Sequence, residues 1–387
     1  MIKPAQSTML TASKPRSSDD AVTLPTPAML AIASKTPTTQ ANYRIAAAFD
    51  VHLQQAASKG PALTLYNNID SSRPSLSFKF IQKSVLGQGV SKVEDDAVIG
   101  CGGHVPGQPQ RCRPDMGQNI GCEYAKCCEC MEFASVDEKR LTAEQRVWYD
   151  NQERLMDLPK RFPYHATEPK TLQSFYLNSR AEIYECTDKC NCGPGCKTRC
   201  VQFGRQVPLE IFKTRNRGWG LRCTVDLVRG QFVDTYVGEI ITDAEATVRE
   251  RHAPPGKSSY LYNLDKYVCD PATCVGGTYH AINCVEEDNM YVVDGEFMGN
   301  ATRFINHSCQ PNLRQYTVSY NKYDRRVYEL AFFAFQDIPA GTELTFDYMD
   351  RDDGEETEKD DLDMKDQKCM CGAPNCRGSF GFSNFER

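Results

Sequence analysis

From residue 208 onward, short apolar runs alternate with glycine- or proline-containing turns. Runs that are rich in β-branched and aromatic residues and bounded by turn residues are typical of strands. They predict a mainly β domain of about 140 residues, starting at residue 208. The predicted strands cover residues 208–212, 220–223, 231–236, 290–293 and 327–333.

Two helices are predicted from their N-terminal capping signals. Thr142 followed by Gln145 matches a capping box, which predicts a helix over about residues 142–156. Thr242 followed by Glu245 has the same pattern and predicts a second helix over residues 242–251.

The N-terminal segment has a different texture. Residues 1 to about 60 are rich in Ala, Ser, Thr and Pro without sustained periodicity, which is typical of disorder. We therefore expect a disordered region over residues 1–75. A transit peptide is a weaker alternative because Asp19 and Asp20 lie within the stretch, and the compact apolar core of a secretory signal is missing.

The composition is that of an ordinary globular protein with one acidic segment. Of 387 residues, 40% are hydrophobic and 25% charged, and no apolar run approaches the ~20 residues of a membrane span. The net charge of −6 argues against a protein that wraps DNA phosphate. Residues 350–366 hold ten acidic and three basic residues. We interpret them as a solvated linker, and attraction of a basic peptide substrate is the alternative.

Nineteen cysteines are the most unusual feature of the chain. Without a secretory signal, dense cysteines more often bind metal than form disulfides. One group runs from Cys186 to Cys196 with C-x3-C-x-C-x3-C spacing, and an earlier group lies between Cys101 and Cys130. The C-x-C pairs are too tight for each sulfur to serve a separate zinc finger.

A cluster of three zinc ions accounts for both groups. Three tetrahedral ions need twelve sulfur positions, and nine cysteines supply them if six bind one ion each and three bridge two ions. In the earlier group the choice between Cys127 and Cys128 stays open. The predicted ligands are Cys101, Cys112, Cys122, Cys128, Cys130, Cys186, Cys190, Cys192 and Cys196.

A further zinc site is predicted near the end of the chain. Cys369, Cys371 and Cys376 make an incomplete set of ligands, so a fourth must come from elsewhere. Cys309 is the nearest upstream candidate in a distinctive context. The six cysteines that remain are predicted to be free thiols: Cys127, Cys200, Cys223, Cys269, Cys274 and Cys284.

Two motifs, RFINHSC at residues 303–309 and ELTFDY at residues 343–348, closely resemble those of the SET-domain protein-lysine methyltransferases. The nine-cysteine block looks like a pre-SET domain, and the terminal cysteines look like a post-SET domain. Together they resemble the suppressor-of-variegation class, which methylates lysine 9 of histone H3 in heterochromatin. The resemblance covers about residues 98 to 381.

This resemblance implies a mainly β fold of small sheets, in which a C-terminal segment is threaded as a pseudoknot. Zinc-binding pre-SET and post-SET regions flank the catalytic domain. The expected boundaries are residues 76–207 for the pre-SET domain, 208–349 for the SET domain, 350–366 for the acidic linker and 367–387 for the post-SET segment.

The resemblance also implies a cofactor, S-adenosylmethionine, beside four zinc ions. Tyr348 matches the catalytic tyrosine, Tyr260 matches an active-site tyrosine, and Asp294 matches a position near the substrate peptide. The residues that match cofactor-binding motifs are Arg217, Gly218, Trp219, Tyr260, Arg303, Asn306 and His307.

The implied chemistry accounts for these residue types. A lysine amine attacks a sulfonium methyl group only when it is neutral, although a free lysine has a pKa of ~10.4. An aromatic channel removes water from the ammonium and lowers this pKa, as does the sulfonium charge. Tyrosine hydroxyls can orient the amine lone pair, so no carboxylate base is required.

Phe346 predicts how many methyl groups are added. In the family, a tyrosine hydroxyl at this position would hold a water in the space of further methyl groups, whereas phenylalanine leaves room. We therefore expect di- and trimethylation.

The class implies the histone H3 tail of the nucleosome as a partner, with heterochromatin proteins beside it, and a location in the nucleus on chromosomes. Neither sequence-specific DNA binding nor membrane binding is expected.

The chain departs from the family in apparent insertions at residues 102–111 and 267–289. Phe380 and Phe382 flank the position where the family places an aromatic residue over the cofactor.

Two other function classes compete with the enzyme. A catalytically silent SET scaffold that binds histone or partner proteins is disfavoured by the intact Asn306, His307 and Tyr348. A zinc-based nucleic-acid binder would need a basic face, which a chain body close to neutral does not provide.

Overall fold

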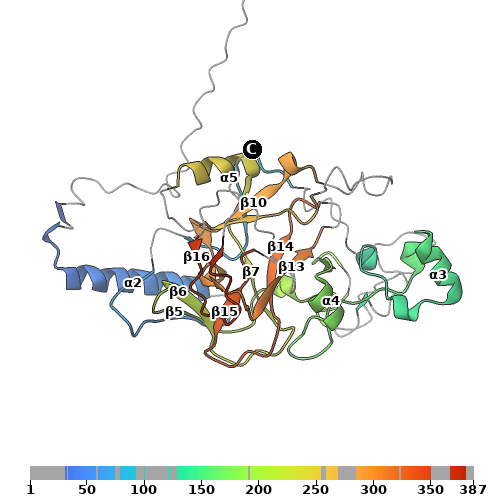
Figure 1. Ribbon diagram of the computed structural model, residues 1–387, viewed down its shortest axis with the longest axis horizontal. Helices are drawn as coiled ribbons and strands as arrows, with labels where there is room; N and C mark the ends of the chain where they lie inside the picture. Colours follow the sequence, from blue (N-terminus) through green and yellow to red (C-terminus); the bar gives the residue numbers. More distant parts are fainter. Residues whose placement is uncertain are drawn as a thin grey trace, which may run out of the picture.

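The computed structural model describes residues 31–32, 34–57, 60–74, 79–92, 100, 121–122, 129–190, 192–253, 259–268, 285–321, 324–349 and 367–380. Over these residues the chain forms three sheets of four or five strands and two smaller strand pairs, with short helices around them (Figure 1). The mainly β architecture predicted from the sequence is confirmed. None of the helices in the described residues combines the length and apolarity needed to span a membrane.

The five-stranded sheet carries two of the predicted strands. Its order is β1-β5-β6-β15-β12, with β12 parallel to β15 and β15 antiparallel to β6. The strands are β1 (Leu63–Tyr66), β5 (Leu209–Lys213), β6 (Trp219–Cys223), β15 (Glu343–Phe346) and β12 (Asn306–His307). The strands predicted at residues 208–212 and 220–223 correspond to β5 and β6.

A second sheet joins the cysteine-rich region to the C-terminal half. Its order is β4-β13-β14-β7, in which β4 lies parallel to β13. The strands are β4 (Ile183–Tyr184), β13 (Leu313–Ser319), β14 (Glu329–Ala334) and β7 (Phe232–Tyr236). Because β4 comes from the cysteine-rich region, that region contributes directly to this sheet.

The third sheet has the order β3-β8-β10-β9 and is covered by the helix predicted at residues 242–251. The strands are β3 (Val85–Leu86), β8 (Glu239–Thr242), β10 (Tyr291–Asp294) and β9 (Leu261–Asn263), and the helix is α5 (Asp243–Arg251). Thr242 caps α5 by accepting a hydrogen bond from the Glu245 backbone N–H. The Glu245 carboxylate also forms an ion pair with Arg249, one helical turn further along α5, at 2.9 Å.

The helix expected at residues 142–156 is shorter than predicted. α3 spans Ala143–Asp150 and has a complete capping box formed by Thr142 and Gln145. It ends because Gln152 and Arg154 adopt left-handed backbone conformations, which cannot continue a right-handed helix. Figure 1 shows α3 at one end of the molecule and α2 at the other.

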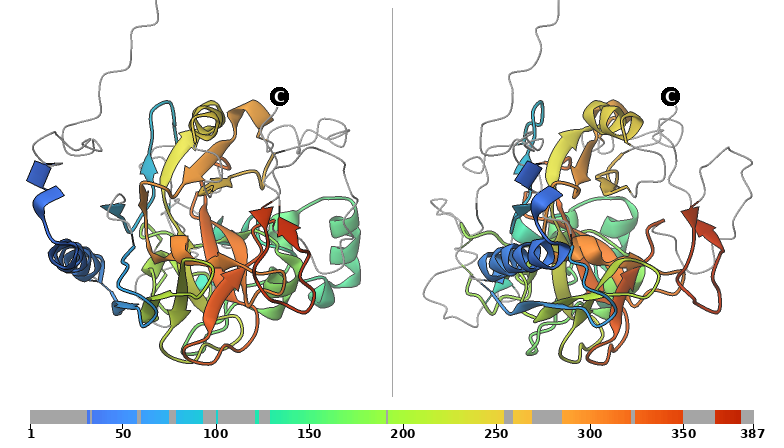
Figure 2. Two further views of the ribbon diagram at one scale, coloured as in Figure 1. Left: turned by 60° about the vertical axis from the view of Figure 1, so that its left-hand side comes forward. Right: turned by 90° about the vertical axis from the view of Figure 1, so that its left-hand side faces the viewer.

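The remaining elements are short. They are α4 (Ser174–Ser179), the strand pairs β2 (Lys79–Phe80) with β11 (Met298–Gly299) and β16 (Gln367–Lys368) with β17 (Ser379–Phe380), and the 3-10 turns η4 (Glu129–Met131), η5 (Glu138–Arg140), η6 (Leu155–Asp157), η7 (Val201–Phe203), η8 (Glu287–Asn289) and η9 (Ala301–Phe304). Figure 2 shows the β16–β17 pair at the periphery of the body.

The expectation of disorder over residues 1–75 is wrong for the part that the structure describes. α2 (Thr38–Ala57) is a helix, and β1 follows it as an edge strand of the five-stranded sheet. Phe49 and Leu53 are 0% and 5% exposed within the main hydrophobic core. With Ala56 they follow the i, i+4, i+7 spacing of a helix face, a signal that the Ala- and Thr-rich composition obscured. Residues 1–30 lie outside the described residues.

One hydrophobic core crosses the expected boundary at residue 207. Tyr164 of the cysteine-rich region stacks on Phe333 of β14 with ring centroids 6.2 Å apart. The buried Tyr316 of β13 donates its hydroxyl to the Leu177 backbone carbonyl at 2.8 Å. The cysteine-rich region and the strands after residue 208 therefore stabilise each other.

Because α2 packs in the main core, Phe49→Ala should lower the free energy of unfolding by about 3–5 kcal/mol. The ring contacts Phe80 edge to face at 6.2 Å and is fully buried. Tyr43→Ala is the matched control because Tyr43 lies on the same helix and is 76% exposed. Denaturant unfolding at constant zinc concentration measures both, and equal midpoints for the two variants would contradict the packing of α2.

Candidate active site and metal centres

Strand pairing brings three distant motifs side by side. Asn306 and His307 on β12 lie opposite Thr345 and Phe346 on β15, and Leu344 of β15 lies opposite Leu221 of β6. The Asn-His motif, the ELTFDY motif and the strand after the Arg217–Trp219 turn therefore occupy adjacent strands of one sheet.

Glu343 links two of the predicted cofactor-binding residues. Its carboxylate forms an ion pair with Arg217 and accepts a hydrogen bond from Asn306 Nδ2 at 2.8 Å. Asn306 Nδ2 also donates to the Trp219 carbonyl at 3.1 Å. Sequence reasoning missed this role, although Glu343 is the first residue of the ELTFDY motif. The acidic side chain was the only signal, and no spacing rule connects it to an arginine more than 100 residues earlier in the chain.

The turn before β6 has the backbone shape that its glycine predicts. Gly218 has φ +69°, in the left-handed region that favours glycine. No described heavy atom lies within 4 Å of the point where its Cβ would stand. The turn is closed by Thr214, whose hydroxyl donates to the Gly218 carbonyl at 3.0 Å. The space beside Gly218 is therefore open.

His307 is buried and neutral. It is 5% exposed, and burial lowers its pKa to about 4 even though Asp347 lies nearby. Its Nδ1 accepts the Tyr348 backbone N–H at 3.2 Å, so the ring proton is on Nε2, which lies 3.4 Å from Cys309 Sγ. The imidazole thus holds Tyr348 on one side and contacts the predicted zinc ligand on the other.

Tyr348 lies among aromatic rings with its hydroxyl engaged. The hydroxyl donates to the Ile305 carbonyl at 2.7 Å. Its ring centroid is 4.8 Å from that of Phe346 and 5.4 Å from that of His307. Burial raises the pKa of Tyr348 well above its usual value. The phenol is therefore protonated at neutral pH and can act only as a hydrogen-bonding group.

Tyr260 lies beside a second tyrosine that sequence reasoning missed. The Tyr236 hydroxyl donates to the Tyr260 carbonyl at 2.7 Å, and the Gly295 N–H donates to the same oxygen at 3.1 Å. A Cβ at Gly295 would collide with the Tyr236 hydroxyl, so glycine is required there. Burial raises the pKa of Tyr236 above its usual value. Tyr236 is the last residue of β7, and the strand pattern alone gave no sign of a role in the site.

Arg303 and Asp294 are held by neighbouring elements. The Arg303 guanidinium lies 4.4 Å from the Tyr260 ring centroid, and its Nε donates to the Gly295 carbonyl at 3.1 Å. Asp294 is 2% exposed, and its carboxylate accepts a hydrogen bond from Arg249 of α5 at 2.7 Å. The Asp294 charge is thus paired inside the protein, which fixes α5 to β10. Its expected proximity to the substrate peptide stays a prediction.

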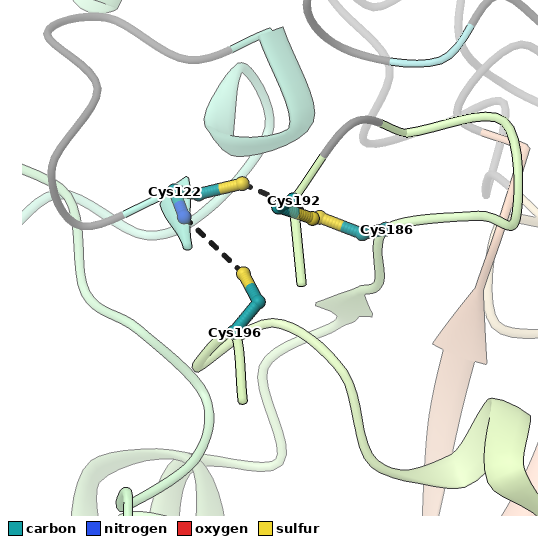
Figure 3. Close-up of side chains that lie close together, drawn as sticks. All are labelled: Cys122, Cys186, Cys192 and Cys196. Carbon is teal, nitrogen blue, oxygen red and sulfur yellow. Dashed lines mark hydrogen bonds between the residues drawn. The ribbon is translucent and has the colours of Figure 1, made fainter. Parts of the chain in front are cut away.

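The cysteine-rich region gathers sulfur atoms in two overlapping groups. The Sγ atoms of Cys122, Cys186, Cys192 and Cys196 lie within 4.8 Å of one another (Figure 3). Cys130, Cys186 and Cys190 form the second group. Cys186 belongs to both, as a bridging ligand must. The predicted ligands Cys101, Cys112 and Cys128, and the alternative Cys127, lie outside the described residues.

The sulfur spacing fits zinc. A tetrahedral ion with Zn–S bonds of about 2.3 Å places its sulfurs about 3.8 Å apart. Cys122 and Cys186 Sγ are 3.3 Å apart, and Cys130 and Cys190 Sγ are 3.5 Å apart. These separations are close to the expected edge, so small adjustments would accommodate an ion.

Thr198 and Arg199 supply polar partners to these sulfurs. The fully buried Thr198 hydroxyl lies 2.7 Å from Cys186 Sγ and 3.0 Å from Cys196 Sγ. Arg199 Nε donates to Cys192 Sγ at 3.2 Å. A hydroxyl and a guanidinium stabilise thiolate charge, which metal binding requires. Neither residue was predicted, because both lie between cysteines without a pattern of their own.

The structure brings the four cysteines of the predicted terminal site together. The Sγ atoms of Cys309, Cys369, Cys371 and Cys376 lie within 4.8 Å of one another, with Cys309 and Cys369 3.8 Å apart. The donor set therefore fits one tetrahedral zinc ion. Of the two aromatic candidates nearby, Phe382 lies outside the described residues, and the structure describes the backbone of Phe380 but not its side chain.

Arg377 ties this terminal site to the catalytic motif. Its guanidinium donates to both oxygens of Asp347, at 2.8 and 2.6 Å, and its backbone N–H donates to Cys309 Sγ at 3.4 Å. Asp347 directly precedes Tyr348. The cysteine site and the predicted catalytic tyrosine are thus connected through one bidentate ion pair.

The other predicted free thiols are partly described. Cys200 and Cys223 are buried and belong to none of the cysteine groups above, as expected. Cys269, Cys274 and Cys284 lie outside the described residues, as do most of the apparent insertion at 267–289, the one at 102–111 and the acidic segment 350–366.

Comparison with known proteins agrees with this geometry. The SET domain family model matches residues 218–349, and the Pre-SET motif model matches residues 55–199. The chain is 38% identical over 323 residues to KMT1 of Fusarium mangiferae, described as a histone-lysine N-methyltransferase specific for H3 lysine 9. This match covers 81% of the chain and 87% of KMT1.

Solved structures show the same fold. The Neurospora SET domain protein DIM-5, a histone lysine methyltransferase, matches 77% of this chain and 98% of its own, with a TM-score of 0.58 and 33% identity. Arabidopsis thaliana SUVH6 in complex with SAM matches 82% of this chain and 53% of its own, with a TM-score of 0.53 and 28% identity. The chain therefore belongs to the family of histone-lysine N-methyltransferases that combine a pre-SET region with a SET domain.

Proposed function

We propose that this protein transfers methyl groups from S-adenosylmethionine to lysine 9 of histone H3. The observation that carries the proposal is the β6–β15–β12 arrangement, which joins the Asn306-His307 motif to the strand leading into Tyr348. The substrate site is supported by KMT1, which is specific for H3 lysine 9 and 38% identical over most of both chains. Heterochromatin formation and gene silencing in the nucleus are the cellular role that this substrate implies.

The residues around the Gly218 turn fit S-adenosylmethionine. We expect the exposed Gly218 and the half-buried Trp219 to contact the cofactor, and Asn306, whose amide donates to the Trp219 carbonyl, to lie beside them. Arg303 and Tyr260, which stack on each other, are the further residues that we expect to contact the cofactor. When bound, this cofactor supplies a methyl group on a positively charged sulfonium.

The aromatic side chains would prepare the lysine amine. Tyr236, Phe346 and Tyr348 are largely buried, so a lysine inserted among them loses water and its pKa falls. The tyrosine hydroxyls stay protonated because burial raises their pKa values. They can therefore orient the neutral amine and do not act as bases. The proton of the lysine ammonium would leave through water, and a carboxylate base is not needed for this step.

The cysteine groups would hold four zinc ions, three in the pre-SET region and one at the terminal site. The sulfur separations and the shared Cys186 support the bridged cluster. The contact between Arg377 and Asp347 supports an influence of the terminal ion on Tyr348 through the residue that precedes it. Metal binding there would order the C-terminal segment over the active site.

The substrate assignment is tested with recombinant histone H3 and mapping of the product. We expect methylation at lysine 9, and none on an H3 peptide in which arginine replaces that lysine. Tyr348→Phe should lower kcat/KM by about 100-fold because the hydroxyl no longer positions the amine. Calorimetry should show cofactor binding retained in this variant. A wild-type protein that binds cofactor but methylates no histone would instead be a silent scaffold.

Phe346→Tyr tests the predicted methylation state. The wild-type protein should give di- and trimethylated H3 peptide, and the variant should accumulate monomethylated peptide because a water bound by the new hydroxyl fills the space of further methyl groups. Mass spectrometry of the peptide at long times distinguishes the two. Only monomethylated product from the wild-type protein would refute the prediction.

The zinc assignment is tested by atomic absorption and chelation. About four zinc ions per chain are expected from the ligand count, and Cys309→Ser should lower the content by one. Cys223→Ser is the matched control because Cys223 is buried and outside the cysteine groups. Chelation should abolish methyl transfer, not merely lower stability. A content of one or two zinc ions in the wild-type protein would overturn the ligand set.

A further inference from the structure

Gln315 is a buried amide within the aromatic surroundings of Tyr348. It lies on β13, is 7% exposed, and faces Phe332 directly across the β13–β14 pair. Residues that face each other across a strand pair project to the same side of the sheet. The Phe332 ring lies 4.8 Å from that of Phe346, which in turn lies 4.8 Å from Tyr348. Gln315 is therefore two rings away from the predicted catalytic tyrosine.

The Gln315 side chain holds a tyrosine from a different sheet. Gln315 Oε1 accepts the Tyr262 hydroxyl at 2.9 Å. Tyr262 lies on β9, two residues after Tyr260, and its ring is 6.0 Å from that of Tyr236. This hydrogen bond connects β9 to β13 and determines where the Tyr262 hydroxyl points.

The amide nitrogen of Gln315 shows that packing alone does not explain why a glutamine stands at this position. No hydrogen-bond partner for its buried Nε2 is found among the described residues. A buried polar group without a partner is unfavourable, so an apolar residue would suit an aromatic layer better. The amide carbonyl that binds Tyr262 is thus the feature that a glutamine provides here and a leucine or methionine does not.

We propose that Gln315 is a positioning residue that sets the number of methyl groups added, by keeping the Tyr262 hydroxyl out of the lysine channel. With its proton donated to Gln315, this hydroxyl does not hold a water beside the substrate amine. The channel then keeps the volume that a second and third methyl group need. The inference rests on the proposed function, because it concerns the product of that reaction.

Removing the amide should restrict the product. Gln315→Met keeps the side-chain length but loses the acceptor, so the Tyr262 hydroxyl takes a water as partner within the channel. We expect kcat/KM for the second methyl transfer to fall by about tenfold, with the first transfer within about threefold of the wild type. Tyr262→Phe alone should leave the product ratio unchanged.

The double variant Tyr262→Phe/Gln315→Met separates this role from a structural one. It should restore the wild-type ratio of mono-, di- and trimethylated H3 peptide, because no hydroxyl remains to be held. Loss of packing would instead slow all transfers together and persist in the double variant. Thr317→Val is the matched control, a buried polar residue two positions along the same face of β13.

Mass spectrometry with unmodified, monomethylated and dimethylated H3 peptides gives the ratios. An unchanged ratio in Gln315→Met, or a double variant that stays restricted to monomethylation, would overturn the inference. Absence of transfer by the wild-type protein to the unmodified peptide would overturn the proposed function itself. The two failures are therefore distinguishable in one experiment.

Discussion

The parallel pairing of β12 with β15 is the constraint on which the active site depends. It places Asn306 and His307 beside the strand that ends at Phe346, across a sequence separation of about 40 residues. Asn312 reinforces the pairing, because its side chain donates to the Glu343 carbonyl at 2.8 Å and accepts the Thr345 N–H at 2.9 Å. Once these two backbones are paired, the side chains of Asn306 and His307 are close enough to contact Glu343 and Tyr348.

Charged and polar side chains that are buried or half-buried pair with one another at the predicted cofactor and metal sites. Glu343 is shared between Arg217 and Asn306, and Arg199 faces the sulfur cluster. Such groups are costly to bury unless each has a partner. In this protein the partners come from distant segments, so burial of one motif requires the others to be in place. Arg377 and Asp347 are another such pair from distant segments, and they connect the terminal cysteines to Tyr348.

The fold and the site were predictable to different degrees. The β-rich half could be predicted because its strands are short apolar runs between turns, and the two capping threonines located α3 and α5. α2 was missed because it has few large apolar residues, chiefly Phe49 and Leu53, within an Ala- and Thr-rich stretch. The packing of these two side chains on the main core depends on the tertiary structure. Tyr236 was missed for a similar reason, since a strand-end tyrosine in a local pattern is equally consistent with ordinary core packing.

The cysteine spacing, the two catalytic-domain motifs and the turn glycine at position 218 can be read directly from the order of amino acids in the chain. These are local properties, in which ligand chemistry and backbone freedom are set by a few neighbouring residues. In contrast, three contacts could not be read from the chain and became visible in the folded protein: Glu343 joins Arg217 to Asn306, Cys186 belongs to both sulfur groups, and Gln315 binds the Tyr262 hydroxyl. Each of these contacts joins strands or loops far apart in the chain, and their geometry depends on how the sheets pair and pack.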